Sequence, residues 1–446
     1  MILNSSFLIK AISKKNNNVI WSNNKFYNNK EFLNKINFWR NKIRSAKIKS
    51  GSLIAFESEF NFNSISFFIS TIIEKLIVIP LPKNQKDLLN LLPCKYYVNL
   101  KTNIIIKKNA KIKNKILKKF QFKKRPGLII FSSGSSGTPK IILHDLLLII
   151  KKFEIPRPGF KSLLMLTFDH LGGINTLLAS LIYKDGAAIC LLNRNPQTVC
   201  KTITKAKAQL LPTTPTFLNI LLISKWYIKY KLDSLKLISY GAEKMPEELL
   251  KKLKKQFKNI KFKQTYGLSE FGVMRTKTKD DNSLSMKIGG EGFKIKIINN
   301  TLYVKSVSNM VGYLNAKQPF DRYGWINTGD KVSVDKKGYI TILGRESEII
   351  NIGGEKVFPQ EIENVLLKNK NVNEVRIIKK RHDLLGEYIV AEVALNKLKY
   401  DKEEISNNLR KFCLKNMTKY KVPSKFIILN KEENLINDRL KKIRIN

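Results

Sequence analysis

The sequence predicts an α/β protein with a large N-terminal domain of mostly parallel, helix-flanked sheets, a β-rich subdomain and a small α+β C-terminal domain. Two observations lead to this prediction. From about residue 50, short apolar runs alternate with helical stretches. From about residue 284, β hairpins replace this alternation, and a compact α+β pattern follows residue 345. We therefore expect domains over residues 1–345 and 346–446, with the β-rich subdomain over about 284–345.

The first domain contains short strands that are apolar along their whole length. We expect them at residues 53–56, 76–81, 127–131, 186–192 and 235–240. Helical stretches such as 64–74 and 246–257 separate them. Continuous apolar runs of this kind are typical of parallel strands, because helices cover both faces of a parallel sheet.

The segments after about residue 284 have the sequence pattern of β hairpins. Residues 293–298 and 301–307 predict a hairpin around Asn299-Asn300, and residues 338–342 predict a further strand. After residue 345 we expect a helix over about 359–367 and a strand over 374–379.

The net charge is unusual, because 82 Lys and Arg residues stand against 35 Asp and Glu, a formal +47. Such an excess can indicate binding to nucleic acid or to an anionic membrane. Here it is mainly Lys and accompanies abundant Asn and Ile, which favours compositional drift at exposed positions. Residues 107–124 carry nine Lys and no acid, and we expect a solvated helix or loop there. A basic nucleic-acid-binding protein is the remote alternative, and no specific nucleic-acid partner is expected.

The cysteines and histidines suggest neither a disulfide framework nor a zinc site. Cys94, Cys190, Cys200 and Cys413 form no Cys-x-x-Cys pair, so we expect reduced core thiols. The N terminus has no signal-peptide pattern, and the apolar run at 64–73 is too short to span a bilayer. We therefore expect a cytoplasmic protein without a transmembrane segment.

The strongest chemical signal is a loop of small and hydroxyl residues directly after the apolar run at 127–131. The loop consists of Ser132, Ser133, Gly134, Ser135, Ser136, Gly137, Thr138, Pro139 and Lys140. Glycines let backbone N–H groups approach an anion, hydroxyls add donors, and the lysine adds a positive charge. The spacing differs from a Walker A loop and from a nucleophile elbow. A flexible linker is not expected next to a buried strand, so the loop predicts a phosphate cradle.

Three further segments follow the loop in order: 265–270 (Thr-Tyr-Gly-Leu-Ser-Glu), 324–330 (Gly-Trp-Ile-Asn-Thr-Gly-Asp) and 344–363, which contains Gly-Gly-Glu-Lys-Val-Phe-Pro-Gln-Glu-Ile-Glu. Together with the loop, they resemble the signatures of the adenylate-forming (AMP-binding) superfamily, which includes acyl-CoA synthetases, peptide-synthetase adenylation domains and luciferases. The resemblance runs from about residue 52 to the C terminus. It implies that the C-terminal domain is a mobile lid joined by a hinge.

The resemblance implies an ATP site built from these segments. The loop would hold phosphates, Glu270 would bind Mg²⁺, and Ser269 would donate to the phosphates. Adenine would lie against the turn of Gly241, Ala242 and Glu243, beside Tyr266, and Thr265 and Gly267 would also belong to the ATP/AMP site. Asp330 would accept from the ribose hydroxyls, and Arg345 would contact ribose or phosphate.

The resemblance also implies a catalytic lysine near the C terminus. The Lys-x-x-Arg spacing selects Lys441, paired with Arg444, although the family's preceding Pro and Gly are missing and Lys442 competes. Ser347 occupies the hinge position where Asp or Lys is usual in the family. Gly353, Gly354 and Lys356 belong to the loop that would approach the site for thiol attack.

The acyl pocket can be aligned in two ways. If His170 is aligned with the histidine of the Phe-His-x-x-Gly segment of acyl-CoA synthetases, residues 168–173 resemble that segment. The glycines that follow, which include Gly172, favour this alignment. Shifted by one residue, Asp169 resembles the ammonium-binding Asp of amino-acid-activating domains. Phe217, Tyr240 and Val273 are further candidates for the pocket wall, although ordinary core packing explains each equally well.

These features lead to the hypothesis of an acyl-CoA synthetase-like ligase. It would use ATP and Mg²⁺ to convert a small carboxylic acid to an acyl-adenylate, and then transfer the acyl group to coenzyme A or to the phosphopantetheine of an acyl carrier protein. An amino-acid-activating enzyme that loads a carrier protein is the alternative. An amidase is disfavoured, because its catalytic lysine would lie upstream of the Ser/Gly loop, whereas Lys140 follows it.

Overall fold

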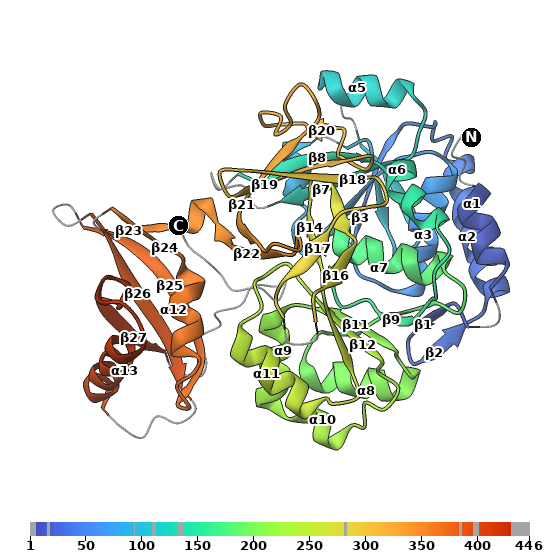
Figure 1. The fold of residues 1–446 in the computed structure, drawn as a ribbon. Helices are drawn as coiled ribbons and strands as arrows, with labels where there is room; N and C mark the ends of the chain where they lie inside the picture. The colour runs from blue at the N-terminus through green and yellow to red at the C-terminus, as the bar shows by residue number, and fades with distance from the viewer. Residues whose placement is uncertain are drawn as a thin grey trace.

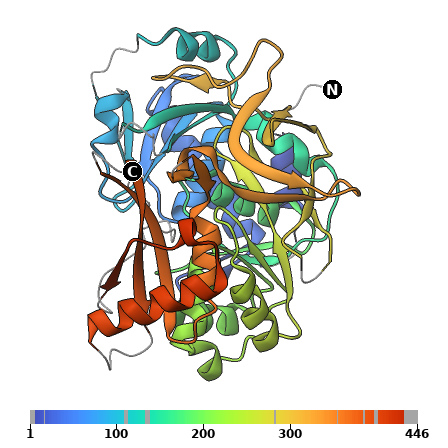
Figure 2. The same ribbon diagram turned by 60° about the vertical axis from the view of Figure 1, so that its left-hand side comes forward.

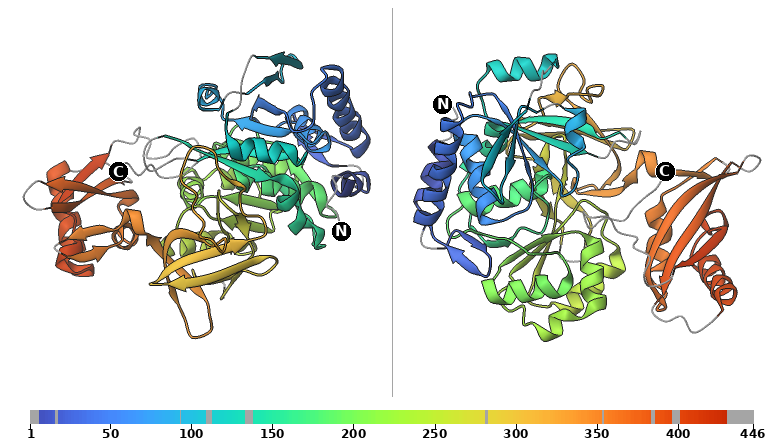
Figure 3. Two further views of the ribbon diagram at one scale, coloured as in Figure 1. Left: turned by 90° about the horizontal axis from the view of Figure 1, so that it is seen from above. Right: turned by 180° about the vertical axis from the view of Figure 1, so that it is seen from behind.

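The computed structural model describes residues 6–15, 18–92, 94–108, 113–132, 138–280, 283–352, 354–382, 386–395 and 401–429. A large body, coloured blue to yellow in Figure 1, contains two seven-stranded sheets and a six-stranded sheet. A smaller orange-to-red unit lies beside it, as both views of Figure 3 also show, and in Figure 2 this unit is turned to the front of the large body. The α/β architecture predicted from the sequence is confirmed.

The first seven-stranded sheet is parallel except at one edge. Its spatial order is β13 (Lys261–Gln264), β12 (Leu237–Tyr240), β11 (Leu210–Thr213), β9 (Lys161–Leu163), β10 (Ala187–Ile189), β1 (Ile20–Ser22) and β2 (Lys25–Tyr27). Only β2 runs antiparallel to its neighbour. Helices α8 (Pro196–Ala206), α9 (Pro215–Ser224) and α11 (Glu247–Gln256) pack on it through one hydrophobic cluster, and α10 (Trp226–Lys229) follows α9.

The second seven-stranded sheet has three parallel pairs at its centre and antiparallel pairs toward its edges. Its order is β20 (Gly312–Tyr313), β8 (Lys140–Asp145), β7 (Gly127–Ser132), β4 (Ile77–Leu81), β3 (Leu53–Glu57), β5 (Tyr96–Asn99) and β6 (Ile104–Lys107). The antiparallel partners of β8 are β7 on one side and β20 on the other. The loop predicted to bind phosphate therefore connects the two strands of a hairpin.

Two helices, α3 (Phe62–Ile73) and α7 (Leu171–Ile182), pack between these sheets in the largest hydrophobic cluster. Apart from Asn63 in its first turn, α3 carries only apolar or hydroxyl-bearing side chains, as expected of a helix that is buried on all sides. Its buried Ser66 and Ser70 hydroxyls donate to backbone carbonyls, so their burial leaves no donor unpaired. The remaining helices of the large body are α1 (Ser6–Ser13), α2 (Asn29–Ser45), α4 (Leu88–Leu91), α5 (Lys115–Phe122) and α6 (Leu146–Lys151), with the 3-10 turn η1 (Lys152–Glu154).

The six-stranded sheet is antiparallel and forms the β-rich subdomain. Its order is β16 (Thr276–Thr278), β17 (Met286–Ile288), β22 (Ile340–Arg345), β21 (Ile326–Val334), β19 (Thr301–Ser306) and β18 (Phe293–Ile298). The predicted hairpin at 293–307 is present, and Asn299 and Asn300 both have positive φ, as its two-residue turn requires. The sheet begins at Thr276, somewhat before the expected residue 284. A separate hairpin, β14 (Tyr266–Leu268) and β15 (Gly272–Met274), precedes it.

The C-terminal unit has a hydrophobic cluster of its own. It contains the hairpin β23 (Ile350–Ile352) and β24 (Glu355–Val357), helix α12 (Pro359–Leu366), strands β25 (Val372–His382), β26 (Gly386–Leu395) and β27 (Lys425–Leu429), helix α13 (Lys402–Asn416) and the turn η3 (Lys419–Lys421). The 3-10 turn η2 (Glu346–Glu348) leads into this unit. The domain boundary at residue 346 stays a prediction.

The sequence analysis expected reduced cysteines in the core and no transmembrane segment. All four cysteines are buried free thiols. Within the described ranges, no helix has both the length and the apolar character to cross a membrane. Part of the Lys-rich segment 107–124 forms α5, which buries Leu117 and Phe120 and leaves its lysines at the surface.

Candidate active site

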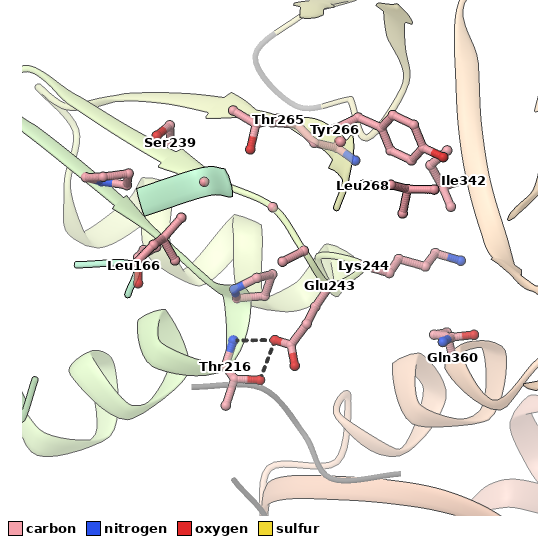
Figure 4. Close-up of a pocket in the computed structure, with 18 of the residues that line it drawn as sticks. Leu166, Thr216, Ser239, Glu243, Lys244, Thr265, Tyr266, Leu268, Ile342 and Gln360 are labelled. Atoms are coloured by element: carbon pink, nitrogen blue, oxygen red, sulfur yellow. Dashed lines mark hydrogen bonds between the residues drawn. The ribbon is translucent and has the colours of Figure 1, made fainter. Parts of the chain in front are cut away.

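A cavity of about 820 Å³ lies where the large body meets the C-terminal unit. Its walls come from segments far apart in sequence, and Figure 4 shows part of them. The lining residues that the sequence analysis singled out are Ser132, Lys140, His170, Gly172, Gly241, Ala242, Glu243, Thr265, Tyr266, Gly267, Ser269, Glu270, Val273, Asp330, Arg345 and Ser347. The fold thus brings the four motif segments to one place.

The predicted phosphate loop is held at both ends by strand pairing. Ser132 at the end of β7 and Lys140 at the start of β8 are partners in the β7–β8 ladder, and both line the cavity. The Lys140 ammonium lies 5.1 Å from the ring centroid of Tyr313. Thr138 is exposed and does not line the cavity. Five members of the loop, Ser133, Gly134, Ser135, Ser136 and Gly137, lie outside the described residues.

The Ser269–Glu270 corner lies at the turn between β14 and β15. The Tyr313 hydroxyl donates to Glu270 Oε1 at 2.6 Å. His144 Nε2 lies 2.8 Å from the Ser269 carbonyl oxygen, which can only accept, so Nε2 carries the proton. Burial lowers the pKa of His144 to about 4, and the imidazole is therefore neutral at pH 7. Neither Tyr313 nor His144 was predicted from the sequence.

Glu270 fits the predicted Mg²⁺ in its donor chemistry. Its carboxylate oxygen is a hard ligand, and the residue faces the same cavity as Lys140. Across the described ranges, no group of three or more His, Cys, Asp or Glu side chains could enclose a metal by itself. A single carboxylate suits an ion that takes its other ligands from nucleotide phosphates and water. When bound there, Mg²⁺ would offset negative charge on the phosphates.

In the turn after β12, the backbone at Gly241 lies very close to Thr265. A Cβ atom on Gly241 would lie 2.3 Å from Thr265 Oγ1, so only glycine fits without displacement. Ala242 has a φ of 68°, in the left-handed region, and lines the cavity. Glu243 Oε2 accepts from the Thr216 hydroxyl at 2.6 Å, a contact drawn in Figure 4. The close approach to Thr265 and the hydrogen bond to Thr216 therefore hold this turn in place at the edge of the cavity.

Asp330 is bound by two neighbours at the strand ladder between β21 and β22. It is the ladder partner of Arg345, whose Nε lies 3.3 Å from Asp330 Oδ1. The Tyr266 hydroxyl donates to Asp330 Oδ2 at 2.5 Å. Burial raises the pKa of Asp330, and the Arg345 guanidinium opposes this increase. Burial and the Asp330 charge raise the pKa of Tyr266, which keeps the phenol protonated as a donor.

The acyl-pocket candidates divide into two groups. His170, Gly172 and Val273 line the cavity, whereas Asp169, Phe217 and Tyr240 do not. Tyr240 and Phe217 belong instead to the hydrophobic cluster beneath the first sheet. The reason for Tyr240 is strand alternation, because its neighbour Ser239 points to the opposite face of β12 and reaches the cavity. The sequence alone could not show which face of each element points into the cavity.

Several lining residues were missed by the sequence analysis. Arg194 follows β10, lines the cavity near Leu166, and donates from Nε to the Met165 carbonyl at 2.7 Å. Lys244 extends toward β22 and donates to the Leu343 carbonyl at 3.2 Å, and Figure 4 shows it between Ile342 and Gln360. Neither residue belongs to a recognisable motif, so no sequence signal indicated them.

The predicted hinge and thiol-side residues lie apart from one another. Ser347, in η2, lines the cavity. Gly354 and Lys356 belong to the β23–β24 hairpin and do not line it. Instead, α12 and its surroundings face the cavity through residues such as Gln360 and Glu363. Gly353, Lys441 and Lys442 lie outside the described residues.

Comparison with known families agrees with the motif order. A family model described as AMP-binding enzyme matches residues 77–317, and a second, described as AMP-binding enzyme C-terminal domain, matches residues 361–435. The first match covers more than half of the chain. The chain belongs to the AMP-binding enzyme family. The resemblance seen in the motifs to the adenylate-forming superfamily is thereby confirmed.

Relatives in this family include acyl-CoA ligases. An uncharacterized acyl–CoA ligase, YhfT, of Bacillus subtilis is 26% identical over 322 residues, covering 67% of this chain and 63% of its own length. The 2-succinylbenzoate–CoA ligase of Bacillus pumilus is 26% identical over 344 residues, covering 71% of this chain and 68% of its own. A mouse mitochondrial medium-chain acyl-CoA ligase, ACSF2, is covered over only 56% of its length. The chain thus spans less than two thirds of several curated relatives.

The fold also matches solved structures of the family. The anthranilate CoA ligase AuaEII in complex with anthranoyl-AMP has a TM-score of 0.79 at 16% identity, covering 95% of this chain and 93% of that one. At this identity, the match supports the shared architecture and says nothing of the substrate.

Proposed function

We propose that this protein is an AMP-forming acid–thiol ligase that activates a carboxylic acid with ATP and passes the acyl group to a thiol. One observation carries the proposal: the phosphate-loop ends, the adenine turn, the Ser269–Glu270 corner and the Asp330–Arg345 pair line one cavity. Each of these elements suits a different part of ATP. Membership of the family and the acyl-CoA ligase relatives support the same reaction class.

In the first step, the substrate carboxylate attacks the α-phosphate, forming an acyl-adenylate and releasing pyrophosphate. Lys140 and the hydroxyls of the loop would hold the phosphates, and Asp330 would accept from the ribose hydroxyls. Glu270 would bind Mg²⁺. Lys441, with Lys442 as competitor, would stabilise the negative charge that develops between the carboxylate and the α-phosphate.

In the second step, a thiol attacks the acyl carbon and AMP leaves. The C-terminal domain, from about residue 346, would turn about Ser347 and bring the Gly353–Lys356 loop to the cavity. Coenzyme A is the proposed acceptor, because several relatives are CoA ligases. The phosphopantetheine of a carrier protein would react by the same chemistry.

The cavity favours an acyl substrate over an amino acid. His170 faces the cavity, whereas Asp169, which would hold a substrate ammonium group, is buried away from it. Arg194 lines the same cavity, and its Nε donates to the Met165 carbonyl. We therefore propose an acid that carries a second anionic group, a chemistry shared by the substrate in the name of the 2-succinylbenzoate–CoA ligase relative.

The decisive experiment is carboxylate-dependent ATP–pyrophosphate exchange with a panel of aliphatic, aromatic, dicarboxylic and amino acids. We expect exchange with at least one dicarboxylic acid and formation of its CoA thioester. Lys441→Ala should reduce exchange by about 100-fold or more, while Lys442→Ala should retain it. Absence of exchange with every acid would refute the proposed function, and the reverse order of the two variants would transfer the catalytic role to Lys442.

A further inference from the structure

Tyr313 lies behind the cavity wall, between two residues that line it. Its hydroxyl donates to Glu270 Oε1 at 2.6 Å, and its ring centroid lies 5.1 Å from the Lys140 ammonium. Tyr313 is only 4% exposed and does not itself line the cavity. It therefore cannot touch a bound nucleotide and can act only through its neighbours.

The backbone of Tyr313 is held from both sides. On one side, β20 pairs with β8, and Tyr313 is the ladder partner of Ile142. On the other side, the Gln318 side chain forms two hydrogen bonds of 2.9 Å, accepting from the Tyr313 N–H and donating to its carbonyl. A side-chain amide thus takes the place of a neighbouring strand. This two-sided pairing determines where the phenol lies.

The strand that holds Tyr313 is the one that carries the phosphate-loop lysine. Lys140 and Ile142 have the same orientation on β8, because side chains two residues apart point to one face of a sheet. Tyr313, opposite Ile142, extends to Glu270 on the β14–β15 turn, which is 43 residues away in sequence. A continuous contact therefore runs from Lys140 through the ring and hydroxyl of Tyr313 to the Glu270 carboxylate.

We propose that Tyr313 is a positioning residue that orients the Glu270 carboxylate for the metal–nucleotide complex and couples it to Lys140. This inference rests on the proposed function, because it takes Glu270 as the metal-binding side chain.

The test is Tyr313→Phe, which keeps the ring over Lys140 and removes the hydroxyl that orients Glu270. The measurement is Mn²⁺ affinity by electron paramagnetic resonance, with a non-hydrolysable ATP analogue and without acid or thiol. We expect the Kd for Mn²⁺ to increase about tenfold, as is usual when a residue that orients a metal ligand is lost. The Mg²⁺ concentration for half-maximal exchange should increase in parallel, and the melting temperature should show that the variant is folded.

A double-mutant cycle distinguishes the loss of Glu270 orientation from a general disturbance of the fold. If Tyr313 acts through Glu270, Tyr313→Phe should cause no further loss of Mn²⁺ affinity in a Glu270→Gln background. Tyr323→Phe, which removes the hydroxyl of a tyrosine that is 59% exposed, is the matched control and should leave the affinity unchanged. An unchanged affinity in Tyr313→Phe, or an equal loss in the Glu270→Gln background, would overturn the inference. Because this measurement needs no acid, it can succeed even if no acid supports exchange and the proposed function fails.

Discussion

At the scale of single residues, Arg194 is the side chain on which the proposed choice of substrate depends. Its Nε donates to the Met165 carbonyl, and the residue lines the cavity. A guanidinium in this position favours a substrate with a second anionic group.

Arg194→Met should therefore raise the KM for a dicarboxylic acid about 10- to 100-fold, the range expected for the loss of one charge-assisted contact. The KM for the matching monocarboxylic acid should change little, because that acid has no group to pair with Arg194. Steady-state kinetics with the two acids provide the measurement. Equal changes for both acids would show that Arg194 supports the cavity wall rather than the substrate charge.

His144 makes folding depend on pH. It is fully buried, and its pKa is lowered from 6.5 to about 4. In the unfolded chain the imidazole binds a proton below about pH 6.5, whereas in the folded protein it stays neutral down to about pH 4. Stability is therefore fully present above pH 6.5 and is lost as the pH falls through this window.

Between pH 7 and pH 5, His144 should account for a loss of about 2 kcal/mol in the free energy of unfolding. His144→Gln does not titrate and can still donate to the Ser269 carbonyl, so its stability should decrease less over the same pH range. Urea unfolding of both proteins at the two pH values checks this. Identical pH dependence in the variant and the parent would contradict the assignment of a neutral, buried imidazole.

At the scale of secondary-structure elements, the ends of neighbouring strands form part of the cavity proposed to bind the nucleotide. The turn after β12 contacts the segment after β13, since Thr265 donates from both N and Oγ1 to the Tyr240 carbonyl. A β-carbon on Gly241 would collide with this contact. The parallel pairing of β12 with β13 therefore requires glycine at the edge of the cavity.

Gly241→Ala should lower the free energy of unfolding by about 1–3 kcal/mol and weaken ATP binding, because the turn must move away from Thr265. Ala242→Gly is the matched control for stability. Ala242 already has a positive φ of 68°, so glycine there should be neutral or slightly stabilising. Chemical unfolding and nucleotide titration test both variants, and a fully stable Gly241→Ala would show that the turn adapts without cost.

At the scale of the whole molecule, the chain carries a formal charge of +47, and its cavity is the proposed site for ATP and coenzyme A. From residue 346 onward there are 21 basic and 15 acidic residues, so 61 basic and 20 acidic residues precede that point. The excess is therefore concentrated in the large body, which carries the phosphate-loop lysine. A field of this sign attracts ATP and coenzyme A from a distance.

Raising the ionic strength from about 0.05 M to 0.3 M should increase the KM for ATP and for coenzyme A several-fold, because salt screens charges beyond about 6–14 Å over this range. The kcat should change less, since contacts inside the cavity are screened less than surface charges. Initial-rate measurements across a salt series decide this. KM values that do not respond to salt would leave compositional drift as the whole explanation of the charge.

The sequence by itself determined the fold class and the motif segments that identify the family. Apolar runs between helices predicted β3, β4, β7, β10 and β12, and the Asn299-Asn300 turn predicted the hairpin of β18 and β19. These features are local, because strand length, turn chemistry and apolar periodicity are encoded within a few residues. The ordered motifs identified the family for the same reason, since each motif is a short contiguous segment.

Only the tertiary structure decided which side chains meet. From the sequence, Phe217 and Tyr240 could equally belong to the hydrophobic core or to the cavity wall. The packing of α9 places Phe217 in the core, and the alternation of side chains along β12 places Tyr240 there. His144 reaches Ser269 across 125 residues and Tyr313 reaches Glu270 across 43. Such contacts depend on the spatial order of strands and on the face each residue occupies. That order is set by the burial of the whole chain rather than by any single segment, so the residues that orient the site carried no signal in the sequence.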